Sequence, residues 1–325
     1  MKKITVITPS FNQGDYLEQT IDSVLSQNYT NLEYIIIDGG STDNSVEIIK
    51  KHEKNLTFWV SEKDNGQSNA INKGLKIATG EVINWLNSDD WYESNALQKV
   101  GAAFENEQTN VFCGRSRIVE DGKEIRQNKG TDIYSTIEKT IGFARIDQPE
   151  TFFRKSCIDK IGLLNENFHY VMDRDWWIRY LLLFGLNGIE KTNDILVNFR
   201  SHASSKTNTY LSKFDGEAHD LYYTIAKQHQ LSEAKIFEDI WQTSLVENAS
   251  YSSALNNDSI QKSIQYYLLQ MAFISYAKDD YHQAKKIIDQ INSTVLNIED
   301  QQHLDQVKKR IKFLPIWLKQ LLNKR

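Results

Sequence analysis

The sequence predicts an α/β domain whose sheet is mainly parallel and flanked by helices, followed by an all-helical extension. Two observations lead to this prediction. Over residues 1–100, short apolar runs alternate with amphipathic segments, a pattern typical of parallel strands joined by helical crossovers. After about residue 210 the strand-like runs stop and only helical patterns follow. We therefore expect two domains, residues 1–210 and residues 211–325.

The first part of the chain alternates strand and helix. The predicted strands occupy 4–8, 32–37, 56–60 and 81–86, and the predicted helices occupy 15–25, the stretch through 46–49, and 67–78. Because such crossovers are right-handed, consecutive strands lie parallel in one sheet. Ligands of these sheets bind outside the carboxyl ends of the strands. Polar residues that directly follow the strands are therefore the first candidates for a site.

The pattern changes after residue 110. Further strands are expected at 111–113, 117–119, 124–127, 148–154 and 194–200, with a helix at 173–184 and an aperiodic loop at 131–145. The extension reads as helical over 214–248, 260–276 and 281–291. Its last two segments resemble a single tetratricopeptide-like hairpin, whose period does not recur elsewhere.

Composition narrows the class of protein. A formal net charge of −5 offers no general attraction for nucleic acid. The two cysteines, Cys113 and Cys157, form no C-x-x-C pair, which fits a reducing compartment. Arg179 interrupts the apolar run 176–186, so no predicted segment spans a membrane. We expect a cytoplasmic protein.

The strongest candidate for chemistry is the run Asn87-Ser88-Asp89-Asp90. Adjacent carboxylates repel each other unless a cation or hydrogen bonds offset the repulsion. Mg²⁺ and Mn²⁺ take few carboxylates from a protein and complete their shells with water and phosphate oxygens. Read alone, the run favours the other interpretation, in which it ends a strand and caps the next helix. The run follows the fourth predicted strand, and polar residues also follow the three strands before it. This shared position favours a metal site.

The other strand ends carry similar groups. Pro9 and Ser10 follow the first strand, Asp38 the second and Asp64 the third. Asp38 precedes two glycines and can accept hydrogen bonds from a ribose or base, or can organise an Asx-type turn. Asp64 and Gln67 face the same crevice, and Lys73 can meet a phosphate or lie solvated on its helix.

A second acidic cluster, Asp173-Arg174-Asp175-Trp176-Trp177, begins a predicted helix. A carboxylate there can act as a general base or can cap the helix. At least one tryptophan should be core, and the other can form a platform for a sugar ring. His202 and Lys206 follow the last strand, where they can meet a metal and a diphosphate or remain solvated.

Taken together, these motifs resemble family-2 inverting glycosyltransferases with the GT-A fold, over about residues 1–206. The resemblance rests on the runs at 8–12, 37–43, 87–90, 148–153, 172–179 and 200–202. It implies a donor that is usually a UDP-sugar, with Thr8, Pro9, Ser10 and Asp38 around the nucleotide. Asp89 corresponds to the metal-binding acid of a D-x-D motif, with Asp90 adjacent and Mn²⁺ or Mg²⁺ as cofactor.

The resemblance also implies a general base. Asp173 stands at the aspartate of the family's Glu-Asp motif, and His202 approaches the metal or the diphosphate. Two positions depart from the family pattern, since Asn87 replaces the first acid of D-x-D and Met172 replaces the glutamate. The second departure leaves Asp173 and Asp175 as alternative bases.

The expected activity is therefore transfer of a hexosyl or N-acetylhexosaminyl group, with inversion, to a hydroxyl of a glycan or lipid-linked acceptor. Two alternatives differ in class. A pyrophosphorylase needs a glycine-rich basic loop after the first strand, and residues 9–13 do not provide one. The second alternative is a catalytically inactive carbohydrate-binding or scaffolding protein. In that case the helical domain would bind a protein partner or a second copy of the chain.

The C-terminal stretch 307–325 is basic and carries an apolar stripe containing Trp317. Such a helix suits an anionic membrane surface, which would make the protein peripheral on the inner face of the cell membrane. The same pattern also fits a helix packed on its own domain.

Overall fold

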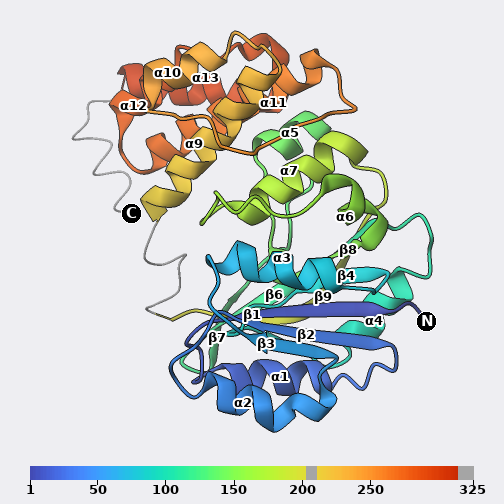
Figure 1. Cartoon of the computed structure of the whole chain (residues 1–325). Helices are drawn as coiled ribbons and strands as arrows, with labels where there is room; N and C mark the ends of the chain where they lie inside the picture. Colours follow the sequence, from blue (N-terminus) through green and yellow to red (C-terminus); the bar gives the residue numbers. More distant parts are fainter. Residues whose placement is uncertain (203–210, 314–325) are drawn as a thin grey trace. The chain divides into compact units, whose positions relative to one another are not determined.

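The computed structural model describes residues 1–202 and 211–313 (Figure 1). The chain divides into two compact units, each of which is discontinuous in sequence. Unit 1 comprises Met1–Ile133, Arg145–Glu217 and Glu247–Ser252, and unit 2 comprises Tyr134–Ala144, Ala218–Val246 and Ser253–Arg325. The domain boundary near residue 210 stays a prediction.

Unit 1 is built on a nine-stranded sheet in the order β3-β2-β1-β4-β8-β6-β9-β5, with β7 paired to β6. Its strands are β1 (Ile4–Ser10), β2 (Leu32–Asp38), β3 (Phe58–Ser61), β4 (Val82–Trp85), β5 (Trp91–Tyr92), β6 (Val111–Glu120), β7 (Lys123–Gln127), β8 (Thr151–Arg154) and β9 (Ile189–Arg200). The strands β3, β2, β1 and β4 are parallel, and β8 runs antiparallel to both β4 and β6. The fold class is as predicted, and the sheet is mixed because of β8, β5 and β7.

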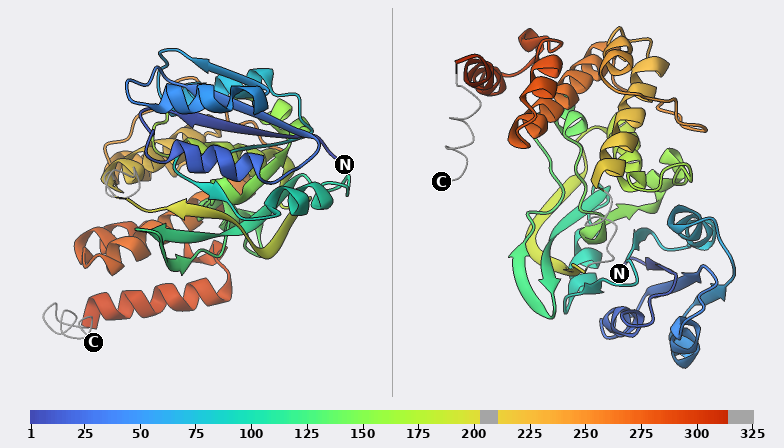
Figure 2. Two further views of the ribbon diagram at one scale, coloured as in Figure 1. Left: turned by 90° about the horizontal axis from the view of Figure 1, so that it is seen from below. Right: turned by 90° about the vertical axis from the view of Figure 1, so that its left-hand side faces the viewer.

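The helices of unit 1 cover both faces of this sheet. They are α1 (Leu17–Leu25), α2 (Ser45–His52), α3 (Gln67–Ile77), α4 (Ala96–Ala103), α6 (Lys155–Ile161) and α7 (Met172–Phe184). Figure 1 shows α1 and α2 on one face of the parallel strands and α3 on the other, and Figure 2 shows α1 and α2 side by side. Single turns of 3-10 helix occur at Glu53–Asn55 and Gln148–Glu150.

Each face has its own apolar core. On the first face, side chains of α1, α2 and α4 pack on β1 and β2, with Ile21, Val100 and Phe104 fully buried. On the second face, Phe153 of β8 lies 4.9 Å from the ring of Trp176 and 6.2 Å from that of Trp177. Both tryptophans are buried, so the suggested sugar platform is wrong. Apolar burial explains why α7 stays fixed on the sheet.

Unit 2 is helical. It contains α5 (Ile137–Gly142), most of α9 (Leu211–Gln228), α10 (Ala234–Ile240), α11 (Asn257–Ala277), α12 (Tyr281–Ile288) and α13 (Ile298–Phe313), with a 3-10 turn at Ser293–Val295. Tyr222 stacks on Tyr267 with ring centroids 3.7 Å apart, and Lys139 forms a buried ion pair with Asp300 at 2.8 Å. Two expectations were wrong: 131–145 contains α5, and the predicted helix 214–248 ends at Ile240.

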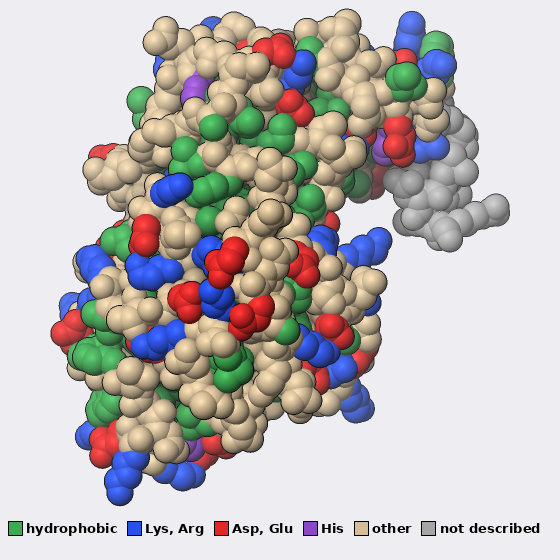
Figure 3. Space-filling model, turned by 90° about the vertical axis from the view of Figure 1, so that its right-hand side faces the viewer, with side chains coloured by type: hydrophobic (Ala, Val, Ile, Leu, Met, Phe, Trp, Pro, Cys, Tyr) green, Lys and Arg blue, Asp and Glu red, His purple; other side chains and the backbone are tan. Residues whose placement is uncertain are grey.

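Within the described ranges, none of the helices combines the length and apolar character needed to cross a bilayer. Acidic and basic side chains are interspersed on the face drawn in Figure 3. The basic stretch 307–325 is described only as far as Phe313, and the rest of that prediction lies outside the described residues.

Candidate active site

The strand ends that the sequence singled out meet at one edge of the sheet. Ser10 is in register with Asp38, and the Gly39 amide donates to the Ser10 carbonyl at 2.8 Å. On the other side of β1, the Leu86 amide donates to the Ile7 carbonyl at 2.9 Å. The segments that follow β1, β2 and β4 are therefore neighbours, as the parallel arrangement requires.

Asp38 is fully buried at the end of β2 and organises the turn after it. Its carboxylate accepts hydrogen bonds from the Gly40 amide at 3.1 Å, the Ser41 amide at 2.9 Å, the Ser41 hydroxyl at 2.5 Å and the Ser61 hydroxyl at 2.7 Å. A Cβ atom at Gly39 would lie 2.7 Å from Asp64 Oδ2. Glycine at this position therefore lets the turn approach Asp64 closely.

A polar chain links the start of α3 to the end of β4. Asp64 Oδ1 accepts from the Gly66 amide at 2.8 Å, which holds the turn before α3. Gln67 Nε2 donates to Asn87 Oδ1 at 2.8 Å, and Asn87 Nδ2 donates to Asp90 Oδ2 at 3.3 Å. Asn87 thus connects both neighbours through its amide, a pairing that a carboxylate could not make because it has no donor.

Asp89 and His202 are brought together from positions far apart in the chain. His202 Nε2 lies 3.0 Å from Asp89 Oδ2, and the Asp89 side chain is 23% exposed. An oxygen ligand and an imidazole nitrogen in an accessible position suit Mn²⁺. The described residues hold no group of three or more His, Cys, Asp or Glu side chains arranged for a metal. Any ion here would thus rely on water and donor oxygens as well.

Asp90 differs from Asp89 because it is fully buried. Its Oδ1 accepts from the Arg200 amide at 3.0 Å, and Arg200 Nε donates to the Asp89 carbonyl at 3.0 Å. Burial and then the charge of Asp89 raise the pKa of the Asp90 carboxyl well above its ordinary value. Its position suggests a role in holding the Asp89 loop.

Arg200 is a site residue that sequence reasoning missed, although it stands two positions before His202. Its guanidinium lies 4.7 Å from the ring centroid of Tyr16 and 4.6 Å from that of Trp91. Cation–π contacts of this kind fix the side chain without using all its donors. Arg200 therefore connects the end of β9 to the Asp89-Asp90 loop.

Two further acids near the site were also missed. Glu150 is buried, and burial followed by the charge of Asp147 raises the pKa of its carboxyl well above its ordinary value. Burial likewise raises the pKa of Asp147, which forms an ion pair with Arg145 at 2.6 Å. The run 148–153 had been noted only as part of the family pattern, and no local signal identified Asp147.

The two candidate bases on α7 have different surroundings. Asp173 is partly exposed at the start of the helix, where Oδ1 accepts from the Arg174 amide at 2.7 Å. Loss of hydration raises its pKa. Asp175 is buried, with Arg179 donating to Oδ2 at 3.0 and 2.8 Å and Tyr251 donating to Oδ1 at 2.8 Å. Both oxygens of Asp175 are thus committed inside the protein.

The remaining predicted residues have different surroundings. The Thr8 hydroxyl is buried 3.1 Å from the Tyr34 hydroxyl, and Lys73 pairs with Glu62 at 2.7 Å. Pro9 and Ser10 end β1, with the Ser10 hydroxyl buried and without a hydrogen-bond partner in the described part of the chain. The Ser88 carbonyl accepts from the Thr20 hydroxyl at 3.0 Å. Lys206 lies outside the described residues.

Comparison with known proteins places this geometry in a family. Residues 5–162 match the sequence model described as "Glycosyl transferase family 2". An uncharacterized glycosyltransferase of Rickettsia prowazekii (strain Madrid E) is 26% identical over 238 residues, which are 69% of this chain and 72% of the relative. Curated relatives thus extend the match beyond the family model.

Solved structures show the same fold. TarS of S. aureus (residues 1–349, in complex with UDP-GlcNAc) superposes with a TM-score of 0.64 at 18% identity, over 95% of this chain and 88% of that one. The chain spans 53% of the longer TarS chain. Mannosyltransferase PcManGT from Pyrobaculum calidifontis, in complex with GDP-Man and Mn²⁺, gives a TM-score of 0.53 at 14% identity, over 98% of this chain and 82% of that one. Residues 5–162 therefore match glycosyl transferase family 2, and the chain has the GT-A fold.

Proposed function

We propose that the protein transfers a sugar from a UDP-sugar to a hydroxyl group of a glycan or lipid-linked acceptor, with inversion at the anomeric carbon. The observation that carries this proposal is the Asp89–His202 pair at the edge where β1, β2 and β4 end. The UDP-GlcNAc complex of TarS, a protein of the same fold, supports UDP as the nucleotide.

In this proposal Asp89 and His202 hold Mn²⁺ or Mg²⁺, while Asp90 and Arg200 keep the Asp89 loop in place. The ion would offset negative charge on the donor diphosphate. Pro9, Ser10, Asp38 and Asp64, together with Gln67, Asn87 and Ser88, would surround the nucleotide and its sugar. Lys73 and Lys206 are assigned to the phosphates, although Lys73 would first have to leave Glu62.

Asp173 is the proposed general base, because the residue is partly exposed, whereas the carboxylate of Asp175 is buried and committed to Arg179 and Tyr251. It would take the proton of the acceptor hydroxyl. The acceptor oxygen then bonds to the anomeric carbon as the bond from that carbon to the diphosphate oxygen breaks. UDP leaves with the bonding electron pair, and a single displacement of this kind inverts the configuration.

Nucleotide binding with and without metal tests this proposal. In a thermal-shift titration with UDP, GDP and UDP-GlcNAc, we expect a larger stabilisation by UDP in the presence of Mn²⁺ than in its absence. Asp89→Ala should lose the Mn²⁺-dependent part, because a ligand that binds more weakly stabilises the folded protein less. Lys50→Gln, an exposed lysine on α2, is the control. Equal UDP binding by Asp89→Ala with Mn²⁺ would exclude the metal site, and binding without any transfer or donor hydrolysis would favour an inactive binding protein.

Membrane contact through residues 307–325 is a separate proposal, based on the basic residues of this stretch such as Lys308 and Lys312. We expect the full chain to float with vesicles that contain anionic lipid and a chain ending at Asp305 to float less. Neutral vesicles are the control. Equal flotation of the two chains would show that this stretch is not a membrane anchor, and protein partners of the helical unit would then be sought.

A further inference from the structure

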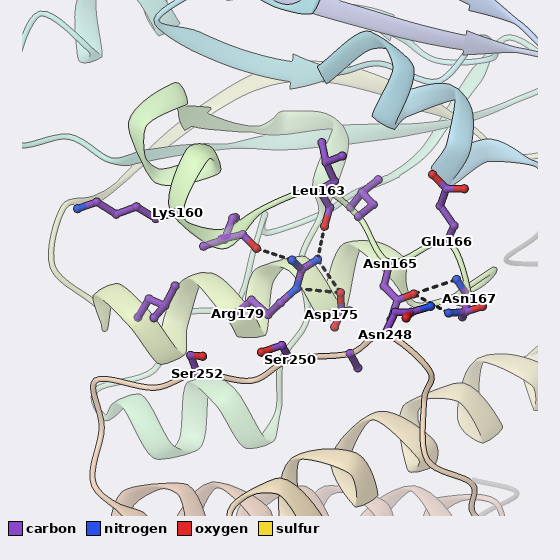
Figure 4. A pocket seen from close by; sticks show the side chains of 14 residues that line it. Lys160, Leu163, Asn165, Glu166, Asn167, Asp175, Arg179, Asn248, Ser250 and Ser252 are labelled. Atoms are coloured by element: carbon purple, nitrogen blue, oxygen red, sulfur yellow. Dashed lines mark hydrogen bonds and ion pairs between the residues drawn. The ribbon is translucent and has the colours of Figure 1, made fainter. Parts of the chain in front are cut away.

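A polar cavity of about 540 Å³ lies beside α7, within unit 1 (Figure 4). Its walls come from the end of α6, the loop that follows it up to residue 167, α7 and the irregular segment 248–252. Among the residues assigned above to donor, metal or base, Asp175 alone lines it. The cavity is in the size range of small-molecule sites, roughly 300–1,000 Å³.

One wall of the cavity is rigid. Arg179 donates to both Asp175 and the backbone carbonyls of residues 161 and 163, the latter at 2.9 Å. The buried Tyr251 donates to the same Asp175 carboxylate at 2.8 Å. The charges of Asp175 and Arg179 therefore cancel locally, and their hydrogen bonds hold the wall in one shape.

The segment on the opposite side of the cavity is held by hydrogen bonds at the residue that precedes it, and several of its side chains are exposed. The Glu247 carbonyl accepts from Asn165 Nδ2 and Asn167 Nδ2, both at 2.9 Å. Beyond it, Asn248, Ser250 and Ser252 are exposed, line the cavity, and make no side-chain hydrogen bond to another described residue. They present a row of amide and hydroxyl groups that can both donate and accept.

The chemistry of the lining selects a neutral ligand rich in hydroxyl groups. Apart from the compensated Asp175 and Arg179, the cavity has one cation, Lys160, and one anion, Glu166, whose oxygens already accept from Asn69 and Asn72. Leu163 and Leu183 add apolar surface, which a sugar ring can cover with its C–H face. An anionic ligand would need surplus positive charge, which this lining lacks.

We propose that this cavity is a saccharide-binding subsite that holds a part of the acceptor glycan away from its reacting hydroxyl. The assignment to the acceptor rests on the proposed glycosyltransferase function, whereas saccharide binding itself does not. α7 carries the cavity residues Asp175 and Arg179 and also has Asp173 in its first turn. A glycan bound here would thus be held against the same helix that presents the proposed base.

Saturation-transfer NMR on the full-length chain tests the subsite, with maltotriose, cellotriose and triacetylchitotriose as probes and no nucleotide present. We expect at least one trisaccharide to bind the unmodified protein. Ser250→Trp should abolish that binding by filling the cavity from an exposed position. Ser250→Ala combined with Ser252→Ala should raise Kd about tenfold through the loss of two hydrogen bonds. Glu247→Gln, whose exposed side chain does not line the cavity, is the matched control and should bind normally.

Three results would overturn the subsite: no binding of any trisaccharide, equal binding by Ser250→Trp, or binding of inorganic phosphate that Ser250→Trp removes. UDP binding measured on the same variants separates this inference from the proposed function. Normal UDP binding without saccharide binding rejects the subsite alone. Saccharide binding that Ser250→Trp removes, in a protein that binds no UDP, rejects the proposed function alone.

Discussion

Asp173 and Asp175 lie two positions apart on α7, and their hydrogen bonds give them different tasks. Asp175 is closed in by Arg179 and Tyr251, so its carboxylate serves the packing of α7 and the adjacent cavity wall. Asp173 accepts a hydrogen bond from the amide that follows it and is partly exposed. The sequence left these two acids as alternatives because spacing along a helix start does not reveal which carboxylate is buried.

Asp173→Asn tests the assignment of the base. We expect the transfer rate to fall by about 10²–10⁴-fold, the usual contribution of a general base, because an amide cannot take the acceptor proton. UDP binding should persist, because asparagine keeps the size and shape of the aspartate side chain. Initial rates of transfer and UDP thermal shifts measure the two effects. Near-normal transfer by the variant would return the role to Asp175 or to another acid such as Asp147.

At the scale of elements, local patterns predicted the parallel strands but not the residues that later strands deliver. The sequence identified the polar residues that follow β1, β2 and β4, because each set directly follows a short apolar run. β8 is inserted antiparallel between β4 and β6, which brings Glu150 to the site. β9 pairs with both β6 and β5, which brings Arg200 to Asp90. Such long-range pairings have no signal in local periodicity.

Some element predictions failed for identifiable reasons. The helix α5 has six residues, too few for a helical period to stand out. The segment after Ile240 reads as helical, yet it is irregular up to Tyr251, whose ring is buried and whose hydroxyl donates to Asp175. In that segment, tertiary contacts override local preference.

Glu33 joins β1, β2 and the loop before β4, and its ionisation should stabilise them. Although burial raises the pKa of this carboxyl, hydrogen bonds from Lys3, Thr5 and Thr79 lower it to about 2 from an ordinary 4.5. A folded-state pKa below the unfolded one gives stability that is present above pH 4.5 and is lost as the pH falls toward 2. The shift corresponds to roughly 3 kcal/mol.

Glu33→Gln should therefore destabilise the protein by about 3 kcal/mol at pH 7 and by clearly less at pH 3. Urea unfolding at the two pH values measures the difference. Glu47→Gln, an exposed glutamate on α2, should change the free energy of unfolding by no more than about 0.5 kcal/mol at either pH. A Glu33→Gln effect that is equal at both pH values would show that its ionisation does not stabilise the fold.

At the scale of the whole molecule, two segments beyond residue 210 belong to unit 1. Glu217 of α9 accepts hydrogen bonds from the amides of His169 at 2.9 Å, Tyr170 at 2.7 Å and Val171 at 3.1 Å, directly before α7. Tyr251 supplies the hydroxyl that satisfies Asp175. The helix that carries the proposed base in its first turn is therefore held by residues that a division at 210 would remove.

A chain ending at residue 210 should consequently be less stable than the full chain and should bind UDP more weakly at the same temperature. In the full chain, Tyr251→Phe should lower the free energy of unfolding by about 1–3 kcal/mol, because it leaves a buried carboxylate oxygen without its donor. Tyr281→Phe, which removes an exposed hydroxyl on α12, should change it by no more than about 0.5 kcal/mol. Thermal and urea unfolding of the four chains provide the comparison. If the chain ending at 210 unfolds at the same midpoint as the full chain and binds UDP equally, then residues 1–210 form a complete domain and the Tyr251 and Glu217 contacts contribute little to it.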